Sequence, residues 1–143
     1  MGIVKLVLDT DVVVAAMRSP RGASAEILRA ARQGRVTLLV SMPLALEYEA
    51  VCSRAEHRLA AGLSAHEAEV FVTAVIAMAE PVFIHFLWRP QLRDAGDEMV
   101  LEAAINGKAD ALVTFNVRDF RPASADFGVA TLLPREVVRR ILP

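Results

Sequence analysis

Hydrophobic residues along the chain alternate between short continuous runs and longer stretches with helical spacing. The runs are rich in Val, Ile and Leu and predict strands buried on both faces, near residues 3–8, 36–40, 81–86, 111–114 and 127–133. The stretches between them predict helices near 12–17, 24–33, 43–54 and 96–107, a helix that follows residues 64–67 and ends near 78, and a last helix from 134. This alternation is typical of an α/β fold with a mainly parallel sheet of about five strands, and no linker divides residues 1–143, so we predict one domain.

Polar residues follow the first apolar run at once, as Asp9, Thr10 and Asp11. In open α/β sheets, ligands bind at the carboxyl ends of the strands, so this position favours a functional carboxylate. A simpler interpretation is that Asp9 or Asp11 caps the next helix, because Asp is a favoured N-cap residue. The other acids of the chain decide between the two.

Helical geometry separates the acids of the helix that begins at Pro43. Leu44, Tyr48 and Val51 form its predicted buried stripe, because they recur at helical spacing. Glu47 borders this stripe, whereas Glu49 projects to the opposite side. Glu47 is therefore predicted to lie at the edge of the core, and Glu49 to be a surface acid.

The helix near 96–107 carries a second inward-facing acid. Asp97 precedes Val100 and Leu101 by three and four residues, so it lies on the apolar face at the first turn. Glu98 and Glu102 are predicted outside that face. Asp94 comes just before the helix and is the better candidate for the cap or for a supporting role beside the site.

The fourth predicted strand also ends in polar residues, at Thr114, Asn116 and Asp119. Asn-x-x-Asp is common in turns, so its value comes from sharing a sheet edge with Asp9. Converging carboxylates raise one another's pKa unless a cation binds them, and oxygen ligands suit a hard ion such as Mg²⁺ or Mn²⁺. The chemistry that such a site performs well is phosphoryl transfer to water.

Composition limits the partners of the chain. Sixteen Lys and Arg against seventeen Asp and Glu give a formal net charge of −1, so no global basic field favours nucleic acid. The 55% of hydrophobic residues indicates either a buried partner surface, such as a homodimer, or an Ala- and Val-rich core. The single cysteine, Cys52, excludes a disulfide framework. Without an apolar segment of membrane-spanning length or a signal-peptide pattern, we expect a cytoplasmic protein that does not enter a membrane.

Four short motifs in order resemble those of PIN-domain nucleases, especially the toxin components of bacterial toxin–antitoxin pairs. The motifs are Leu8-Asp9-Thr10-Asp11-Val12, Leu46-Glu47-Tyr48, Arg93-Asp94-Ala95-Gly96-Asp97 with Leu101 and Ala104, and the segment 109–120. The resemblance covers essentially the whole chain and implies a PIN-like three-layer α/β/α fold. It also implies Mg²⁺- or Mn²⁺-dependent hydrolysis of single-stranded RNA that leaves a 5′-phosphate and a 3′-hydroxyl, with an antitoxin protein as a partner.

The resemblance also assigns roles. The three acids of the family correspond to Asp9, Glu47 and Asp97, which would hold the metal. Its fourth position, often Asp, is Asn116 here, and an amide brings no charge; Asp119 or the extra acid Asp11 is expected to compensate. Catalytic and metal residues are thus expected to be Asp9, Glu47, Asp97, Asn116 and Asp119. Supporting residues are expected to be Thr10, Asp11, Asp94 and Thr114, and Arg18, Arg21 and Arg118 could contact RNA phosphates.

Two other functions remain open. A haloacid-dehalogenase-type phosphatase would use Asp9 as its nucleophile and Asp11 as its acid, but it also needs a lysine such as Lys108 and a later acidic pair. A PIN-like interaction module that has lost catalysis is compatible with Asn116 and with the apolar composition. Metal binding separates this module from a nuclease.

Overall fold

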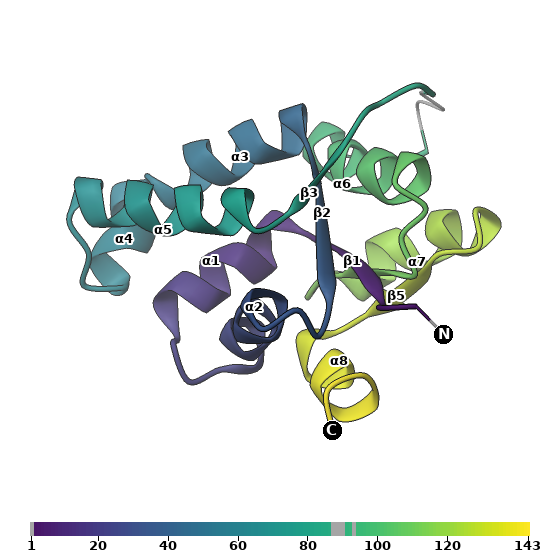
Figure 1. Ribbon diagram of the computed structural model, residues 1–143. Helices are drawn as coiled ribbons and strands as arrows, with labels where there is room; N and C mark the ends of the chain where they lie inside the picture. Colours follow the sequence, from purple (N-terminus) through teal and green to yellow (C-terminus); the bar gives the residue numbers. More distant parts are fainter. Residues whose placement is uncertain (1, 87–90, 93) are drawn as a thin grey trace.

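The computed structural model describes residues 2–86, 91–92 and 94–143, and five parallel strands lie at its centre (Figure 1). The strand order is β3-β2-β1-β4-β5, and all four pairings are parallel. This arrangement, flanked by helices, confirms the predicted α/β/α fold. The strands are β1 (Lys5–Leu8), β2 (Thr37–Ser41), β3 (Glu80–Val82), β4 (Ala111–Val113) and β5 (Ala130–Leu132).

Helices cover both faces of the sheet (Figure 1). Helix α6 packs against β1, β2 and β4 on one face and has α7 beside it, whereas α1 packs on α2, and α2 on α8. Helices α3, α4 and α5 extend to one side of the sheet in Figure 1. The helices are α1 (Thr10–Arg18), α2 (Ala23–Arg32), α3 (Met42–Cys52), α4 (Ala55–Ala60), α5 (Ala65–Ala77), α6 (Ala95–Asn106), α7 (Val117–Asp126) and α8 (Pro134–Arg140).

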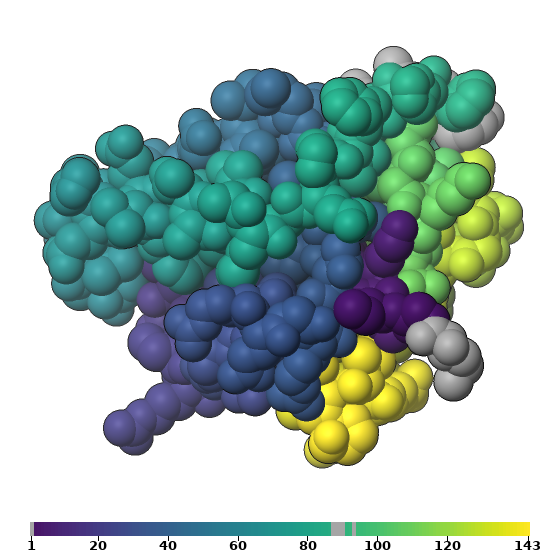
Figure 2. All heavy atoms as spheres, in the orientation of Figure 1, coloured from purple at the N-terminus to yellow at the C-terminus, as the bar shows by residue number. Residues whose placement is uncertain are grey.

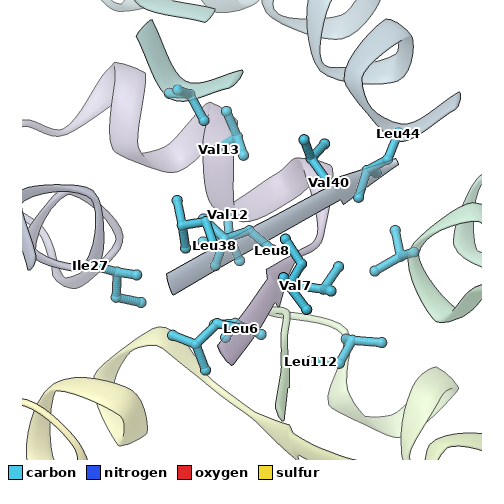
Figure 3. Close-up of a cluster of buried hydrophobic side chains, with 14 of the residues drawn as sticks. Leu6, Val7, Leu8, Val12, Val13, Ile27, Leu38, Val40, Leu44 and Leu112 are labelled. Atoms are coloured by element: carbon cyan, nitrogen blue, oxygen red, sulfur yellow. The ribbon is translucent and has the colours of Figure 1, made fainter. Parts of the chain in front are cut away.

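The core lies around the three central strands (Figure 3). Leu6 and Val7 of β1 are fully buried, with Leu112 of β4 beside them, as expected for a strand covered on both faces. Val13 of α1 and Leu44 of α3 close the core from the helices. Burial of this apolar surface fixes the position of β1, and therefore of the residues that follow it.

Four of the predicted strands are shorter in the structure, and the third and fifth differ most. The third was predicted over 81–86, but β3 ends at Val82, and the backbone N–H groups of His85 and Phe86 donate to Asn106 Oδ1 at 3.0 Å each. A side chain of α6 thus takes the place of a neighbouring strand. The fifth was predicted over 127–133, but α7 occupies the chain as far as Asp126, and Gly128 turns it with φ 73°.

Helix α6 is enclosed on more sides than its sequence pattern indicates. Glu98 and Glu102 were predicted outside its apolar face, yet they are only 4% and 5% exposed. The prediction was wrong because the segment after β3 covers this side of the helix. Glu98 Oε1 accepts the backbone N–H groups of Gln91 and Leu92 at 2.7 Å each, which satisfies the buried carboxylate.

Helices α4 and α7 were not predicted, and α7 begins within the Asn-x-x-Asp segment, with Asn116 as its N-cap residue. The single cysteine, Cys52, is buried and unpaired, as expected. Within the described residues, every helix is too short or too polar to cross a membrane.

Candidate functional site

Asp9 joins the end of β1 to the start of α1. Its backbone N–H donates to Val113 O at 2.9 Å, which ties it to the end of β4. Its side chain is the N-cap of α1, with Oδ1 accepting from Thr10 N at 2.8 Å, and Oδ2 accepts from Thr114 Oγ1 at 2.7 Å. Capping and a functional position are therefore not alternatives here, because one carboxylate occupies both.

Asp11 lies in the first turn of α1, close to the end of β4. Its Oδ2 accepts from the backbone N–H of Phe115 at 3.2 Å. Its Oδ1 is buried and, among the described residues, has no hydrogen-bond partner. Such an orphaned carboxylate oxygen is costly, so it indicates that another group completes its environment.

Helix α3 positions Glu47 at the same edge of the sheet. Leu44 and Tyr48 anchor the buried side of the helix, and Ser41 caps it by accepting from Leu44 N at 3.3 Å. The Tyr48 hydroxyl donates to Leu8 O at 2.5 Å, at the end of β1. This bond ties α3 to Leu8, the residue before Asp9. Glu47, the residue before Tyr48, is half-buried, in agreement with its predicted place at the edge of the core.

Helix α6 contributes Asp97 from its first turn. Asp94 is the N-cap, as predicted, and its Oδ1 accepts from Gly96 N at 2.7 Å. The cap leaves Asp97 half-buried, while Val100 and Leu101 are buried beneath it. Arg93, which belongs to the same sequence motif, lies outside the described residues.

The end of β4 supplies a chain of polar groups. The buried Thr114 hydroxyl donates to Asp9 Oδ2 and accepts from Asn116 N at 2.8 Å. Asn116 is the N-cap residue of α7, and its Nδ2 donates to Asp119 Oδ2 at 2.8 Å. This bond commits the amide nitrogen of Asn116 to Asp119 and leaves the carbonyl oxygen as its acceptor.

These elements surround one hollow of about 380 Å³, which we call the acid hollow. It brings together four of the five predicted site residues and three of the four supporting ones. Asp119 instead lines a neighbouring hollow, together with Asp94 and Asp97. The residues of the acid hollow are Asp9, Thr10, Asp11, Val14, Glu47, Val51, His57, Asp94, Gly96, Asp97 and Asn116.

His57 of α4 also lines the acid hollow, and sequence reasoning missed it. Its Nδ1 lies 3.4 Å from Arg18 Nη1, and its Nε2 lies 3.6 Å from Glu56 Oε1. No sequence pattern indicated His57, because α4 is a short helix that was not predicted. Arg18, one of the cations expected to contact phosphate, lies next to His57 and therefore close to the acid hollow.

Burial dominates the electrostatics of the acid hollow. The pKa of Asp9 is raised to about 7, first by burial and then by the charge of Asp11. Burial also raises the pKa of Asp11. The pKa of Asp97 is raised to about 6, first by burial and then by the charge of Asp9. The acids thus lie close enough to repel one another, as their convergence at one sheet edge predicted.

The donor set suits a hard divalent cation. Five carboxylates and one amide line the acid hollow, and its described lining contains no lysine or arginine to neutralise them. Asp11 Oδ1 is an acceptor without a donor. No three His, Cys, Asp or Glu side chains of the described residues have the geometry to hold one ion between them. This fits Mg²⁺, which keeps several waters and takes only one or two protein carboxylates beside substrate phosphate.

The phosphatase alternative needs a lysine close to Asp9, and Lys108 does not lie there. Lys108 is exposed and follows the carboxyl end of α6, whereas Asp97, which lines the acid hollow, is in the first turn. Twelve residues of helix, about 18 Å, separate the two ends. Lys108 therefore lies too far away to contact a group bound at Asp9.

Comparisons with known proteins agree with the fold. Residues 5–118 match the PIN-domain family. Among solved structures, the fold is similar to a chain of the VapBC2 complex from Rickettsia felis, bound to a DNA fragment from its promoter. The match has a TM-score of 0.64 at 14% sequence identity and covers 90% of this chain and 98% of that one. No curated protein sequence matches this chain significantly.

Proposed function

This chain belongs to the PIN-domain family, and from that premise we propose that it is a metal-dependent endoribonuclease that cuts single-stranded RNA. The observation that carries the proposal is the acid hollow, where one buried carboxylate, three half-buried ones and the exposed Asp94 converge and the described lining contains no lysine or arginine. Water would attack phosphorus and the bond to the 3′-oxygen would break, leaving a 5′-phosphate and a 3′-hydroxyl. The choice of RNA rests on the family resemblance of the motifs.

Asp9, Glu47 and Asp97 are the residues proposed to hold Mg²⁺ or Mn²⁺, at most two of them directly in this geometry and the rest through water bound to the ion. Asn116 or Asp119 would orient the attacking water. When bound, the ion supplies the charge that activates water and stabilises the leaving oxygen. Thr114 would hold Asp9 in place by its hydrogen bond, and Asp11 would offer its orphaned oxygen. Asp119 would act from the neighbouring hollow, through its bond to Asn116.

We further propose an antitoxin protein as partner, bound over an apolar hollow on the side of α5. This hollow of about 530 Å³ lies between α1, α2 and α5, is lined by Met17, Leu28 and Phe71, and has Val70 55% exposed at its edge. Figure 2 shows α5 (teal) lying along α2 (blue) on this side. The structural relative comes from a complex named VapBC2, which supports a protein partner. The predicted homodimer would use the same apolar surface as the antitoxin. Size-exclusion chromatography of the protein with and without the antitoxin distinguishes a homodimer from a complex with the antitoxin.

The interaction module without catalysis is the second candidate, favoured by the neutral Asn116 in place of an acid. A module of this kind would bind Mn²⁺ poorly and would not cut RNA in any metal. Its partner surface would remain.

The test is cleavage of a labelled single-stranded RNA with Mn²⁺, Mg²⁺ or EDTA. Asp97→Asn should slow metal-dependent cleavage by more than about 100-fold, because it removes a charge at the metal. Glu49→Gln, an exposed acid of the helix that carries Glu47, is the matched control and should cut normally. Intact cleavage by Asp97→Asn would remove this residue from the site, and no cleavage by the folded wild type would favour the interaction module.

A further inference from the structure

A second hollow, which we call the side hollow, lies between α6 and α7 and adjoins the acid hollow. Its volume is about 440 Å³, within the range of about 300–1,000 Å³ that is usual for ligand sites. Asp94 and Asp97 line both hollows. A nucleic-acid strand with one phosphate at these acids would therefore have the side hollow beside it, next to a neighbouring nucleotide.

One wall of the side hollow is held by a buried side chain. Gln91 and Leu92 line it, and both their backbone N–H groups donate to Glu98 Oε1 at 2.7 Å. Hydrogen bonds to a charged, buried acceptor are strong, so this wall is fixed to α6. Glu98 follows Asp97 in sequence, and one helical turn thus positions both the acid at the metal and the wall of the side hollow.

The lining of the side hollow combines apolar surface with carboxylate acceptors. Leu92, Pro122 and Ala123 are apolar, whereas Asp119 and Arg118 add opposite charges from the first turn of α7. Among the described lining residues, three carboxylates against one guanidinium disfavour a phosphate inside. They favour a ligand that presents a flat apolar surface together with N–H or O–H donors. A nucleoside has both, since its base stacks and its ribose hydroxyls and amino groups donate.

We propose that the side hollow binds the nucleoside next to the scissile phosphate, with the base against Leu92 and Ala123 and a donor of the base or ribose on Asp119. The proposal rests on the proposed nuclease function and adds a substrate contact to it. Glu98 would be a positioning residue, because it acts through the backbone of residues 91 and 92. Arg118 would lie where the strand leaves the hollow, near the following phosphate.

The test combines a change in the protein with a change in the RNA. Ala123→Leu fills the side hollow, and Ala125→Leu places the same side chain on an exposed position of the same helix as a control. The RNA is a fluorescent single strand with its base removed at one position at a time. Binding is measured by anisotropy with Ca²⁺ replacing Mn²⁺, and the cut site is mapped with Mn²⁺.

Removing the base beside the cut should weaken binding to the wild type and to Ala125→Leu by about tenfold. The same removal should have almost no effect on Ala123→Leu, which already binds the intact RNA about tenfold more weakly. Leu92→Ala adds no volume and should also reduce the effect of base removal. This variant replaces Ala123→Leu in the test if Ala123→Leu does not fold. An equal effect in wild type and in the folded variants, with cleavage intact, would overturn the side hollow alone. A folded wild type that neither binds nor cuts the RNA would overturn the nuclease function and this site with it.

Discussion

The ends of β1 and β4 lie side by side at one edge of the sheet but carry different chemistry. At the end of β1, Asp9 and Asp11 are largely buried carboxylates, and burial raises the pKa of both. At the end of β4, a hydroxyl and an amide do the hydrogen bonding, from Thr114 and Asn116. The two ends are linked by the Thr114 hydroxyl, which donates to Asp9.

This difference indicates that the two ends contribute in different ways. The charges that a cation would neutralise lie on the side of β1 and α6, and burying them lowers the stability of the metal-free protein. At the end of β4, Thr114 and Asn116 are neutral and orient the groups beside them, and Asp119 is the acid that adds to the repulsion at Asp97. If so, changes at β1 should affect the pH dependence of stability, and changes at β4 should affect geometry and metal affinity.

The largest expected effect is the pH dependence of stability in EDTA. The folded protein binds a proton at Asp9 up to about pH 7, whereas the unfolded chain releases it near the ordinary pKa of 3.8. The contribution of this group to the free energy of unfolding is therefore fully present below about pH 4. It is lost as the pH rises to about 7, by at most about 4 kcal/mol. Urea unfolding at a series of pH values measures it.

Asp9→Asn should flatten this dependence and raise the stability at pH 7, because no charge is then buried. Asn116→Ala, at the end of β4, should keep the slope of the wild type. A slope that is unchanged in Asp9→Asn, or lost in Asn116→Ala, would contradict the division between the two ends. Mn²⁺ should stabilise the wild type more at pH 7 than at pH 5, since protons compete for the same oxygens.

A smaller effect is expected from the link between the ends. Thr114→Val keeps the shape of the side chain but removes the donor to Asp9 and the acceptor of Asn116 N. We expect a loss of about 1–3 kcal/mol in stability and a cleavage rate about 10- to 100-fold lower. Thr131→Val is the matched control, because it also loses a buried hydroxyl contact, to Ser124 at 2.5 Å, but lies on β5 away from the acids. Equal rates for the two variants would mean that the bond to Asp9 has no catalytic role.

The comparison of the two ends also shows what the sequence could predict. The run 6–8 is apolar without alternation, so its burial, its strand and the place of Asp9 at the carboxyl end of that strand follow from elementary patterns. Helical spacing predicted that Glu47 and Asp97 face inward, and both line the acid hollow. These two predictions depend on local periodicity, which can be read from the sequence without knowledge of distant contacts.

The features that sequence reasoning missed depend on distant contacts. Glu98 was predicted outside the apolar face of α6, because helical spacing contains no information about the segment after β3. That segment supplies the two backbone N–H groups that donate to the Glu98 carboxylate. Asn116 and Asp119 were predicted at the end of a strand, without a helix, whereas in the structure Asn116 is the N-cap residue of α7 and Asp119 lies in its first turn. Asp119 lines the neighbouring hollow and not the acid hollow, although its side chain accepts a hydrogen bond from that of Asn116.

The smallest expected effect is at Asn116, where the chain has an amide in place of an acid. Asn116→Asp adds a charge at the acid hollow and should tighten Mn²⁺ binding by about tenfold, which calorimetry measures. It also replaces the hydrogen bond from Nδ2 to Asp119 by a pair of like charges, so the metal-free protein should lose about 1 kcal/mol of stability. The exchange Asn116→Asp with Asp119→Asn keeps the total charge and allows the bond to re-form with its direction reversed. This double variant should therefore retain the tighter Mn²⁺ binding without the loss of stability. If it binds Mn²⁺ no better than the wild type, the end of β4 provides no ligand, and its role is restricted to holding Asp9 and the start of α7.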